Sequence, residues 1–314
     1  MVDIDRFNSN IYIGKSCIYS VIQNIMLLNN IKFSEIELFI MSNGLKLEYN
    51  KNKFSISLAL EECLNNFKKY KIYITKIENN IDIKKYIDKY FRNSQLALIE
   101  TKTKFLTYQP LYNNSFSLNH CIMAYDYNFR DNILYIADTH MINDNIGTLS
   151  TFTGEVKFDI LREGIEKIYF FDISKFNNNF NDKYFLKLWK KYLQEFLNNN
   201  ALKSYIKDIK YMQIKQINDL KSCALKIVFD NKFLGFMFII NYIEVFLYEY
   251  NLISLFNSDL LDLKNKVEIA NYMFIKSSVL LDVKYFYKGI DKLLLCYYQL
   301  NSFIKSLICE LNKI

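Results

Sequence analysis

Apolar residues recur at helical spacing over most of the chain, and the first clear helix begins near residue 17. Positions three and four apart are apolar here: Ile18, Val21, Ile22, Ile25 and Leu28. This pattern predicts an amphipathic helix from Cys17 to about Asn29. Ser16, directly before it, is a suitable N-cap. The sequence therefore places Cys17 in the first turn of a helix.

The next hundred residues predict a mixture of helices and strands. The tetrapeptide SEIE at 34–37 has the form of a capping box that opens a second helix, which Gly44 can end. A strand or turn is expected at 45–49, followed by a helix at 55–70 and another at 83–91. Short runs of β-branched and aromatic residues predict strands at 71–77, 95–100 and 105–108.

Two runs rich in Ile, Tyr and Met, Asn119–Asp126 and Ile133–Asp138, flank a polar segment suited to a turn. We expect a β-hairpin here. If the turn is centred on Phe129, His120 lies directly across from Asp138, with Cβ atoms roughly 5 Å apart. A slip of one residue would put the two side chains on opposite faces.

After the hairpin, the pattern predicts a polar loop at 147–154, a short helix at 156–162 and a strand at 167–173. The polar run KFNNNFND at 175–182 resembles a boundary. Beyond it every apolar pattern is helical, in segments at 183–198, 201–209, 212–228, 232–256 and 259–312, the last broken at least once. The expected fold is thus α+β: a domain at 1–176 with helices packed on an antiparallel sheet, followed by an α-helical region at 183–314.

Composition narrows the class of protein. With 314 residues and 51% hydrophobic content, the chain can bury a full core. Its net charge of +7 is spread without an arginine cluster, which argues against binding nucleic acid. The most apolar run, 233–250, is interrupted by Asn241, Glu244 and Glu249, so we expect a core helix and not a membrane span. An acidic N-terminus without an apolar segment predicts a cytoplasmic protein.

The aromatic residues of the second half of the chain could have either of two structural roles. Aromatic positions at helical spacing usually form a core, although they could also line a substrate channel. The same helices could bury a homodimer interface.

Six cysteines without CxxC spacing do not predict a disulfide framework in a cytoplasmic chain of this length. Cys17 differs from the others by its position. The free N–H groups and positive dipole end of a helix favour a thiolate, which is the nucleophilic form of cysteine. Simple packing is the commoner fate of a cysteine and stays the alternative.

Together, Cys17, His120 and Asp138 have the composition of a catalytic triad, with the carboxylate orienting the imidazole and the imidazole activating the thiol. Taken singly, His120 could be a buried structural imidazole and Asp138 a carboxylate at a strand end. His140 could replace His120 in another register. Cys121 should face away from His120, so we rank it below Cys17 as the nucleophile.

A metal site is a weaker reading of the same residues. His120, His140, Cys121 and Asp138 could supply ligands, but HC followed by DxH matches no common zinc spacing. We therefore expect no metal and no bound cofactor.

The order of these motifs resembles the N-terminal domain of butirosin biosynthesis protein H and its relatives, which are papain-like cysteine enzymes. The resemblance rests on Cys17 at a helix start, on Gly44 with Tyr49, on His120 opening a strand and on Asp138 closing the next, and it covers roughly residues 10–175. It implies a papain-like domain. It also implies an acyltransferase that takes an acyl group from the phosphopantetheine thioester of an acyl or peptidyl carrier protein and hands it to a small amine. A related amide-forming enzyme serves closthioamide assembly.

One departure concerns the oxyanion hole, the donors that stabilise the charged oxygen of the intermediate. Papain-like enzymes often have a Gln shortly before the nucleophile, and none precedes Cys17. Asn8, Asn10 or the backbone N–H of Cys17 could serve instead. A thioester or peptide hydrolase with the same triad, and a binding protein without turnover, are the alternative functions.

Overall fold

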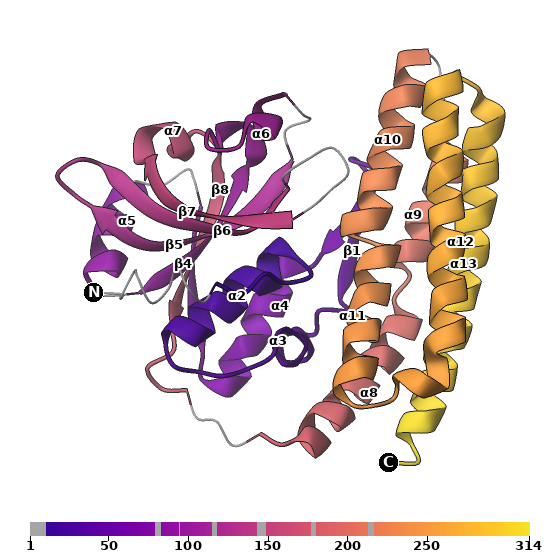
Figure 1. The fold of residues 1–314 in the computed structure, drawn as a ribbon, viewed down its shortest axis with the longest axis horizontal. Coiled ribbons are helices and arrows are strands. Elements are labelled where there is room, and N and C mark those ends of the chain that lie inside the picture. Colours follow the sequence, from indigo (N-terminus) through magenta and orange to yellow (C-terminus); the bar gives the residue numbers. More distant parts are fainter. Residues whose placement is uncertain are drawn as a thin grey trace. The chain divides into compact units, whose positions relative to one another are not determined.

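The computed structural model describes residues 11–78, 83–93, 95–114, 118–142, 149–176, 180–212 and 217–314. The protein is α+β, with an antiparallel sheet, associated helices and a helical C-terminal region (Figure 1). Its contacts divide the chain into two compact units. The first contains Met1–Leu38 and Leu64–Asn178, and the second contains Phe39–Cys63 and Asn179–Ile314.

A six-stranded sheet is the framework of the first unit in the described residues, with the order β3-β8-β4-β5-β6-β7 and antiparallel pairing throughout. Its strands are β3 (Tyr73–Glu78), β4 (Leu96–Lys102), β5 (Asn119–Asn128), β6 (Ile133–Ile142), β7 (Leu149–Lys157) and β8 (Ile165–Asp172). The expected hairpin is the pair β5–β6, which lies at the centre of the site described below.

Helices cover this sheet. Helix α2 (Cys17–Leu28) crosses β4, β5 and β6 (Figure 1). A separate apolar cluster contains α5 (Ile83–Arg92) together with Ile122 and Ala124 of β5. Because side chains alternate along a strand, Cys121 and Met123 face the other side, which α2 covers. The shorter helices of this unit are η1 (Phe67–Tyr70), η2 (Thr103–Phe105), α6 (Pro110–Asn114) and α7 (Phe158–Arg162).

The helix-start signals are confirmed. Ser16 caps α2, its hydroxyl oxygen accepting a hydrogen bond from the N–H of Tyr19 at 3.2 Å. In α3 (Glu35–Ser42), the capping box is complete: the N–H of Glu37 donates to Ser34 Oγ at 3.3 Å, and the N–H of Ser34 donates to Glu37 Oε2 at 2.7 Å. Each cap joins residues three positions apart, so the local backbone geometry is enough to form its hydrogen bonds.

The end of α3 differs in one detail from the expectation. Asn43, with φ at 60°, takes the left-handed conformation, and Gly44 follows it. The N–H of Gly44 bonds the carbonyl of Phe39 at 2.8 Å, and the N–H of Asn43 bonds that of Ile40 at 3.1 Å, which is the Schellman pattern. Glycine is needed because a Cβ at position 44 would lie 2.4 Å from the Phe39 ring.

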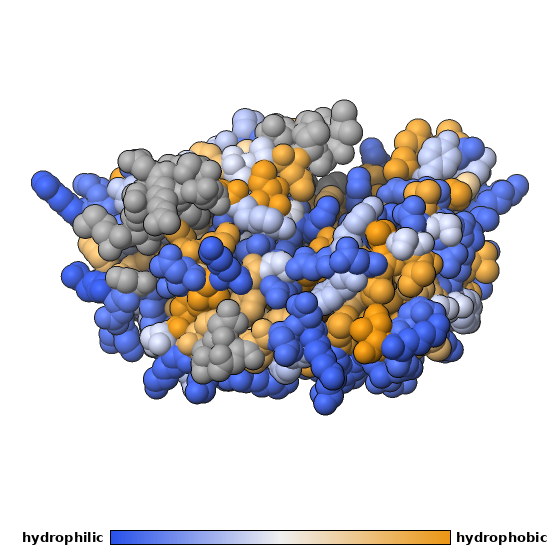
Figure 2. All heavy atoms as spheres, turned by 60° about the horizontal axis from the view of Figure 1, so that its bottom comes forward, coloured by the Kyte–Doolittle hydropathy of each residue, from blue (hydrophilic) through white to orange (hydrophobic). Residues whose placement is uncertain are grey.

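The second unit is mainly helical. Long helices predominate: α8 (Asp182–Asn198), α9 (Ala201–Lys210), α10 (Ile217–Phe233), α11 (Phe236–Glu249), α12 (Ile253–Leu280) and α13 (Val283–Leu311). The second unit also contains a hairpin of β1 (Leu47–Asn50) and β2 (Ser55–Leu58). The first residues of α4 (Leu60–Asn66) belong to it as well, up to Cys63. Figure 2 shows apolar side chains emerging among hydrophilic ones on the surface. Exposed apolar side chains of α12 include Tyr272 and Val279, which are 58% and 72% exposed.

Three expected elements are wrong. Residues 55–58 form strand β2 and not the start of a helix, because Ser-Ile-Ser-Leu alternates polar and apolar residues. The strand expected at 105–108 is replaced by η2 and a turn. The loop expected at 147–154 is strand β7 from Leu149 onward, a Ser- and Thr-rich strand that pairs with β6.

The division into units departs from the expected domains 1–176 and 183–314 in one segment, residues 39–63. Aromatic packing explains it. The ring of Phe39 stacks on Tyr242 of α11, with centroids 3.8 Å apart, and lies edge-on to Trp189 of α8 at 6.0 Å. Separately, no helix in the described ranges combines the length and apolarity needed to cross a membrane.

Candidate active site

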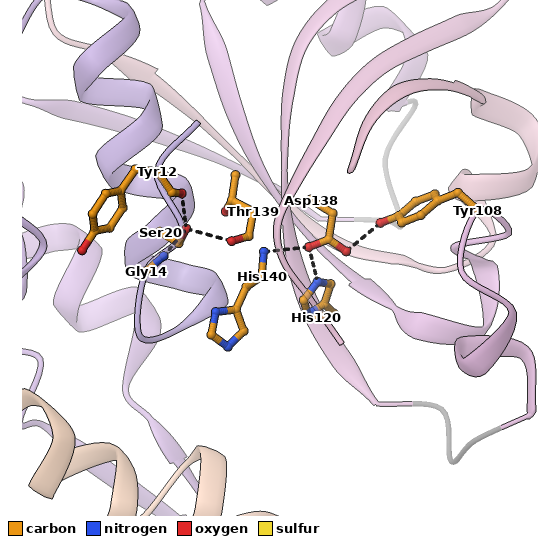
Figure 3. A network of polar contacts seen from close by, with 8 residues as sticks. All are labelled: Tyr12, Gly14, Ser20, Tyr108, His120, Asp138, Thr139 and His140. Atoms are coloured by element: carbon orange, nitrogen blue, oxygen red, sulfur yellow. Dashed lines mark hydrogen bonds and ion pairs between the residues drawn. The ribbon is translucent and has the colours of Figure 1, made fainter. Parts of the chain in front are cut away.

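The β5–β6 hairpin brings His120 and Asp138 together, but through a different register from the expected one. Met123 pairs with Ala137, whereas a turn centred on Phe129 would pair it with Tyr135. A shift of two residues keeps each side chain on its face of the sheet. Nε2 of His120 accordingly lies 2.9 Å from Oδ1 of Asp138 (Figure 3).

Asp138 is completely buried and receives several hydrogen bonds. The backbone N–H of His140 donates to its Oδ1 at 3.1 Å, and the Tyr108 hydroxyl donates to its Oδ2 at 2.9 Å. A register shift between Asp138 and Met141 in the β6–β7 ladder accompanies this turn of the backbone toward the carboxylate. Burial opposes ionisation, but the charge of His120 and these donors lower the pKa of Asp138. The carboxylate is therefore ionised.

Cys17 lies at the first position of α2 and is partly exposed. Hydrogen bonding with Cys121 lowers the pKa of the Cys17 thiol most, and hydrogen bonding with His120 lowers it further, against the effect of burial. The result is a pKa well below the usual thiol value. In return, the hydrogen bond to Cys17 raises the pKa of Cys121. The opposite directions of the two pKa shifts favour the thiolate on Cys17 over one on Cys121.

The mutual pKa effects of Cys17 and Cys121 indicate that the two thiols interact, which the sequence interpretation did not predict. Cys121 does alternate with His120 along β5, but the face it occupies is the one that α2 covers, and α2 carries Cys17. Strand alternation alone could not show this, because it does not say which helix covers which face.

His120 completes the arrangement. Burial is the largest single effect and disfavours the charged form of His120, but the negative charge of Asp138, the interaction with Tyr112 and the hydrogen bonds to Asp138 and Cys17 together outweigh it. The pKa of His120 is raised well above its usual value. A lowered thiol pKa beside a raised imidazole pKa favours a thiolate–imidazolium pair, which is the reactive form of a Cys–His site.

A second network fixes the start of α2 to the sheet (Figure 3). The Ser20 hydroxyl accepts from the N–H of Gly14 at 3.1 Å and lies 3.0 Å from the carbonyl of Tyr12 and 3.2 Å from that of Thr139. Thr139 stands between Asp138 and His140 on β6. Ser20 therefore ties the helix that carries the thiol to the strand that carries the carboxylate.

The buried carboxylate of Glu35 supports the loop before Cys17. It accepts from the N–H groups of Lys15 at 2.9 Å and Ser16 at 3.3 Å, and from the Tyr12 hydroxyl at 3.2 Å. Sequence reasoning missed both Glu35 and Ser20. The one available signal was that Glu37 alone completes the capping box, which leaves Glu35 without an assigned role.

Backbone N–H groups at the start of α2 are the candidate donors for an oxyanion hole. Asn8 and Asn10 lie outside the described residues. At the start of α2, Ser16 satisfies the N–H of Tyr19, while the N–H groups of Cys17 and Ile18 have no acceptor within the helix. These backbone donors are suited to an anionic oxygen.

Gly44 and Tyr49, which contributed to the resemblance, belong to the second unit. Gly44 ends α3, and the Tyr49 hydroxyl donates to Asp208 Oδ2 at 3.0 Å. Both positions thus have structural roles there.

Comparison with known proteins adds no relative: no family model matches the chain, and no curated protein shows significant similarity to it. Within the described residues, no three His, Cys, Asp or Glu side chains are grouped to hold a metal ion. The functional argument therefore rests on the site itself.

Proposed function

We propose that the protein is a cysteine acyltransferase, with Cys17 as the nucleophile, His120 as the acid–base and Asp138 as the carboxylate that orients it. The observation that carries this proposal is the 2.9 Å contact between His120 Nε2 and the buried carboxylate of Asp138. The lowered pKa of the Cys17 thiol and the raised pKa of His120 support it. The resemblance of the motif order to papain-like enzymes supports the same reading.

The first half-reaction forms an acyl-enzyme. The Cys17 thiolate attacks the carbonyl carbon of a thioester, the C–S bond to the donor breaks, and the imidazolium of His120 protonates the departing thiolate. The negative oxygen of the intermediate binds the N–H groups at the start of α2. His120 is left neutral, and Asp138 keeps its ring oriented.

The second half-reaction transfers the acyl group to an amine. The amine nitrogen attacks the acyl carbon, His120 takes a proton, and Cys17 leaves as a thiolate. Exchange between two thiols is nearly balanced, and conversion of a thioester to an amide is downhill, so no nucleotide is needed. The resemblance favours a carrier-protein thioester as donor, with the acyl group on phosphopantetheine, and a small amine as acceptor in natural-product assembly.

Intact mass tests this proposal directly. The protein is incubated with short acyl thioesters of N-acetylcysteamine, and we expect one acyl adduct. Cys17→Ala should abolish it, whereas Cys309→Ala, which removes an exposed cysteine of α13, should retain it. Absence of any adduct across a varied panel would favour a binding protein.

A hydrolase with the same triad is the second candidate. It would form the same adduct but release the free acid at the same rate with or without amine. Product analysis with added amine separates the two, because only a transferase yields amide.

A further inference from the structure

Helix α12 leaves a stripe of apolar side chains uncovered on the second unit. Its opposite side is buried through residues such as Leu263, Val267 and Phe274. The α12 stripe consists of five large side chains that are between 41% and 72% exposed: Leu261, Ile269, Tyr272, Ile275 and Val279. Apolar surface gathered along one helix in this way usually marks an interaction site, whereas single exposed apolar residues are normal.

The spacing along the stripe is typical of a helix that packs lengthwise against another helix. Steps of four and three residues alternate through the positions that form its centre line: Leu261, Asn265, Glu268, Tyr272, Ile275 and Val279. This is the a/d pattern of a coiled coil. Two of these positions are polar, and polar residues at such places fix the register and orientation of the pair at a cost in stability. The partner of α12 is therefore expected to be another helix in a defined register.

Charged residues lie along one edge of the stripe. Asp262, Ile269 and Lys276 follow one another at intervals of seven residues, so they share one side of the helix. The side chain of Asp262 is 51% exposed and binds the Lys266 ammonium at 2.6 Å. The ammonium of Lys276 lies 4.3 Å from the centre of the Tyr285 ring. The edge thus reads acid, isoleucine, base, and reversing the direction of the helix exchanges the acid and the base.

A second copy of the chain, running in the opposite direction, complements this edge. In an antiparallel pair with a two-fold axis at Ile269, residues equally far from the axis stand level on the same side. Asp262 of each copy then faces Lys276 of the other copy, and the two Ile269 side chains meet. On the centre line, Leu261 comes within one turn of Val279 of the second copy. A parallel pair, in which equal residues stand level, brings no acid of this edge opposite a base.

From this self-complementarity we infer that the protein forms an antiparallel homodimer through α12, with Ile269 at the two-fold axis. The dimer covers the α12 stripe and forms two equivalent ion pairs between Asp262 and Lys276. The inference does not depend on the proposed acyltransferase activity, because no residue of the candidate active site takes part in the contact.

Charge reversal tests the pairing in the full-length protein. Analytical ultracentrifugation gives the dissociation constant of the dimer for wild type, Asp262→Lys and Lys276→Asp. Each change puts like charges opposite each other twice, so we expect the constant to rise at least about tenfold. Mixing the two variants restores both contacts. A mixture in which one variant carries a tag should therefore form the heterodimer in native mass spectrometry.

The apolar part of the contact is tested at the axis. Ile269→Asp brings two carboxylates together and should weaken the dimer at least about tenfold. The matched control is Ile160→Asp in α7, because the two isoleucines are almost equally exposed, at 43% for Ile160 and 46% for Ile269. The control should leave the dissociation constant unchanged.

A cross-link in the wild type needs no variant that must fold. A carbodiimide joins a carboxylate directly to an amine in contact with it. Within one copy, Asp262 and Lys276 are about 21 Å apart along the helix, at 1.5 Å per residue, so a bond between them must link two copies. We expect this linked peptide from the covalent dimer.

The inference is overturned if the wild type stays monomeric at about 100 μM, which would leave the stripe to a different partner. A dimer without the linked peptide would also overturn it, as would one that survives Ile269→Asp, because another surface would then hold the copies together. Failure of the two charge variants to form a heterodimer would refute the antiparallel register.

Discussion

Hydrogen bonding with Cys121 is the largest single cause of the lowered pKa of the Cys17 thiol, and His120 lowers it further. We predict that Cys121→Ala raises the pKa of the Cys17 thiol and slows its alkylation by iodoacetamide at pH 6 about tenfold, which corresponds to one pKa unit. The rate of Cys17 modification as a function of pH, followed by peptide mass, measures this. The matched control Cys63→Ala removes another buried cysteine and should leave the profile unchanged; an identical profile in Cys121→Ala would contradict the assignment.

Tyr108 stabilises the buried carboxylate of Asp138 through its hydroxyl, while its ring stacks on Phe152 at 4.1 Å. Tyr108→Phe keeps the stack and removes the donor. We expect the free energy of unfolding at pH 7 to fall by about 2 kcal/mol, as for a hydrogen bond to a charged group. Urea unfolding measures it. Tyr86→Phe, which also alters a stacked tyrosine, is the control and should change little.

The sign of the pH dependence follows from the lowered pKa of Asp138. A carboxyl whose folded-state pKa is lowered contributes stability above its unfolded pKa, near 4, and that contribution is lost as the pH falls through the folded value. The difference between wild type and Tyr108→Phe should therefore shrink in acid. A difference that grows below pH 4 would contradict an ionised Asp138.

At the scale of elements, Ser20 couples α2 to β6. Ser20→Ala leaves the N–H of Gly14 and the carbonyls of Tyr12 and Thr139 without this hydroxyl. We predict a loss of about 1 to 3 kcal/mol in unfolding free energy, together with slower acylation of Cys17. Ser306→Ala, at an exposed serine of α13 that bonds only the carbonyl of Ser302, should cost less than about 0.5 kcal/mol. Equal effects of the two changes would mean that Ser20 does not link the two elements.

At the scale of the whole molecule, the chain enters the second unit twice. A fragment of residues 1–176 retains Phe39 but lacks Tyr242 and Trp189, against which that ring packs. We predict that this fragment aggregates or lacks fixed tertiary structure, because residues 39–63 expose their apolar side chains. Near-UV circular dichroism and gel filtration test this. A monodisperse, folded fragment would show that residues 1–176 are an independent domain.

The sequence by itself determined the features that depend on near neighbours. The caps at Ser16 and Ser34, the helical periodicity and the β5–β6 hairpin follow from side chains within a few residues of one another. Residue alternation put His120 and Asp138 on one face because the irregularity between Ala124 and Asp126 changes the register error from three residues near the turn to two residues beyond it. The prediction failed at 55–58, where the alternation of polar and apolar residues spans only four positions, and at 149–154, a run rich in Ser and Thr that pairs with β6.

Only the tertiary structure decided the relations between distant segments. Which face of the sheet α2 covers determines that Cys121 lies near enough to lower the pKa of Cys17. The register shift after Asp138 turns the N–H of His140 toward the carboxylate. Likewise, Phe39 joins the second unit because its aromatic partners are Tyr242 and Trp189. The contacts of Cys17 and of Phe39 form between residues about 100 or more positions apart, and no local pattern encodes which surfaces will meet.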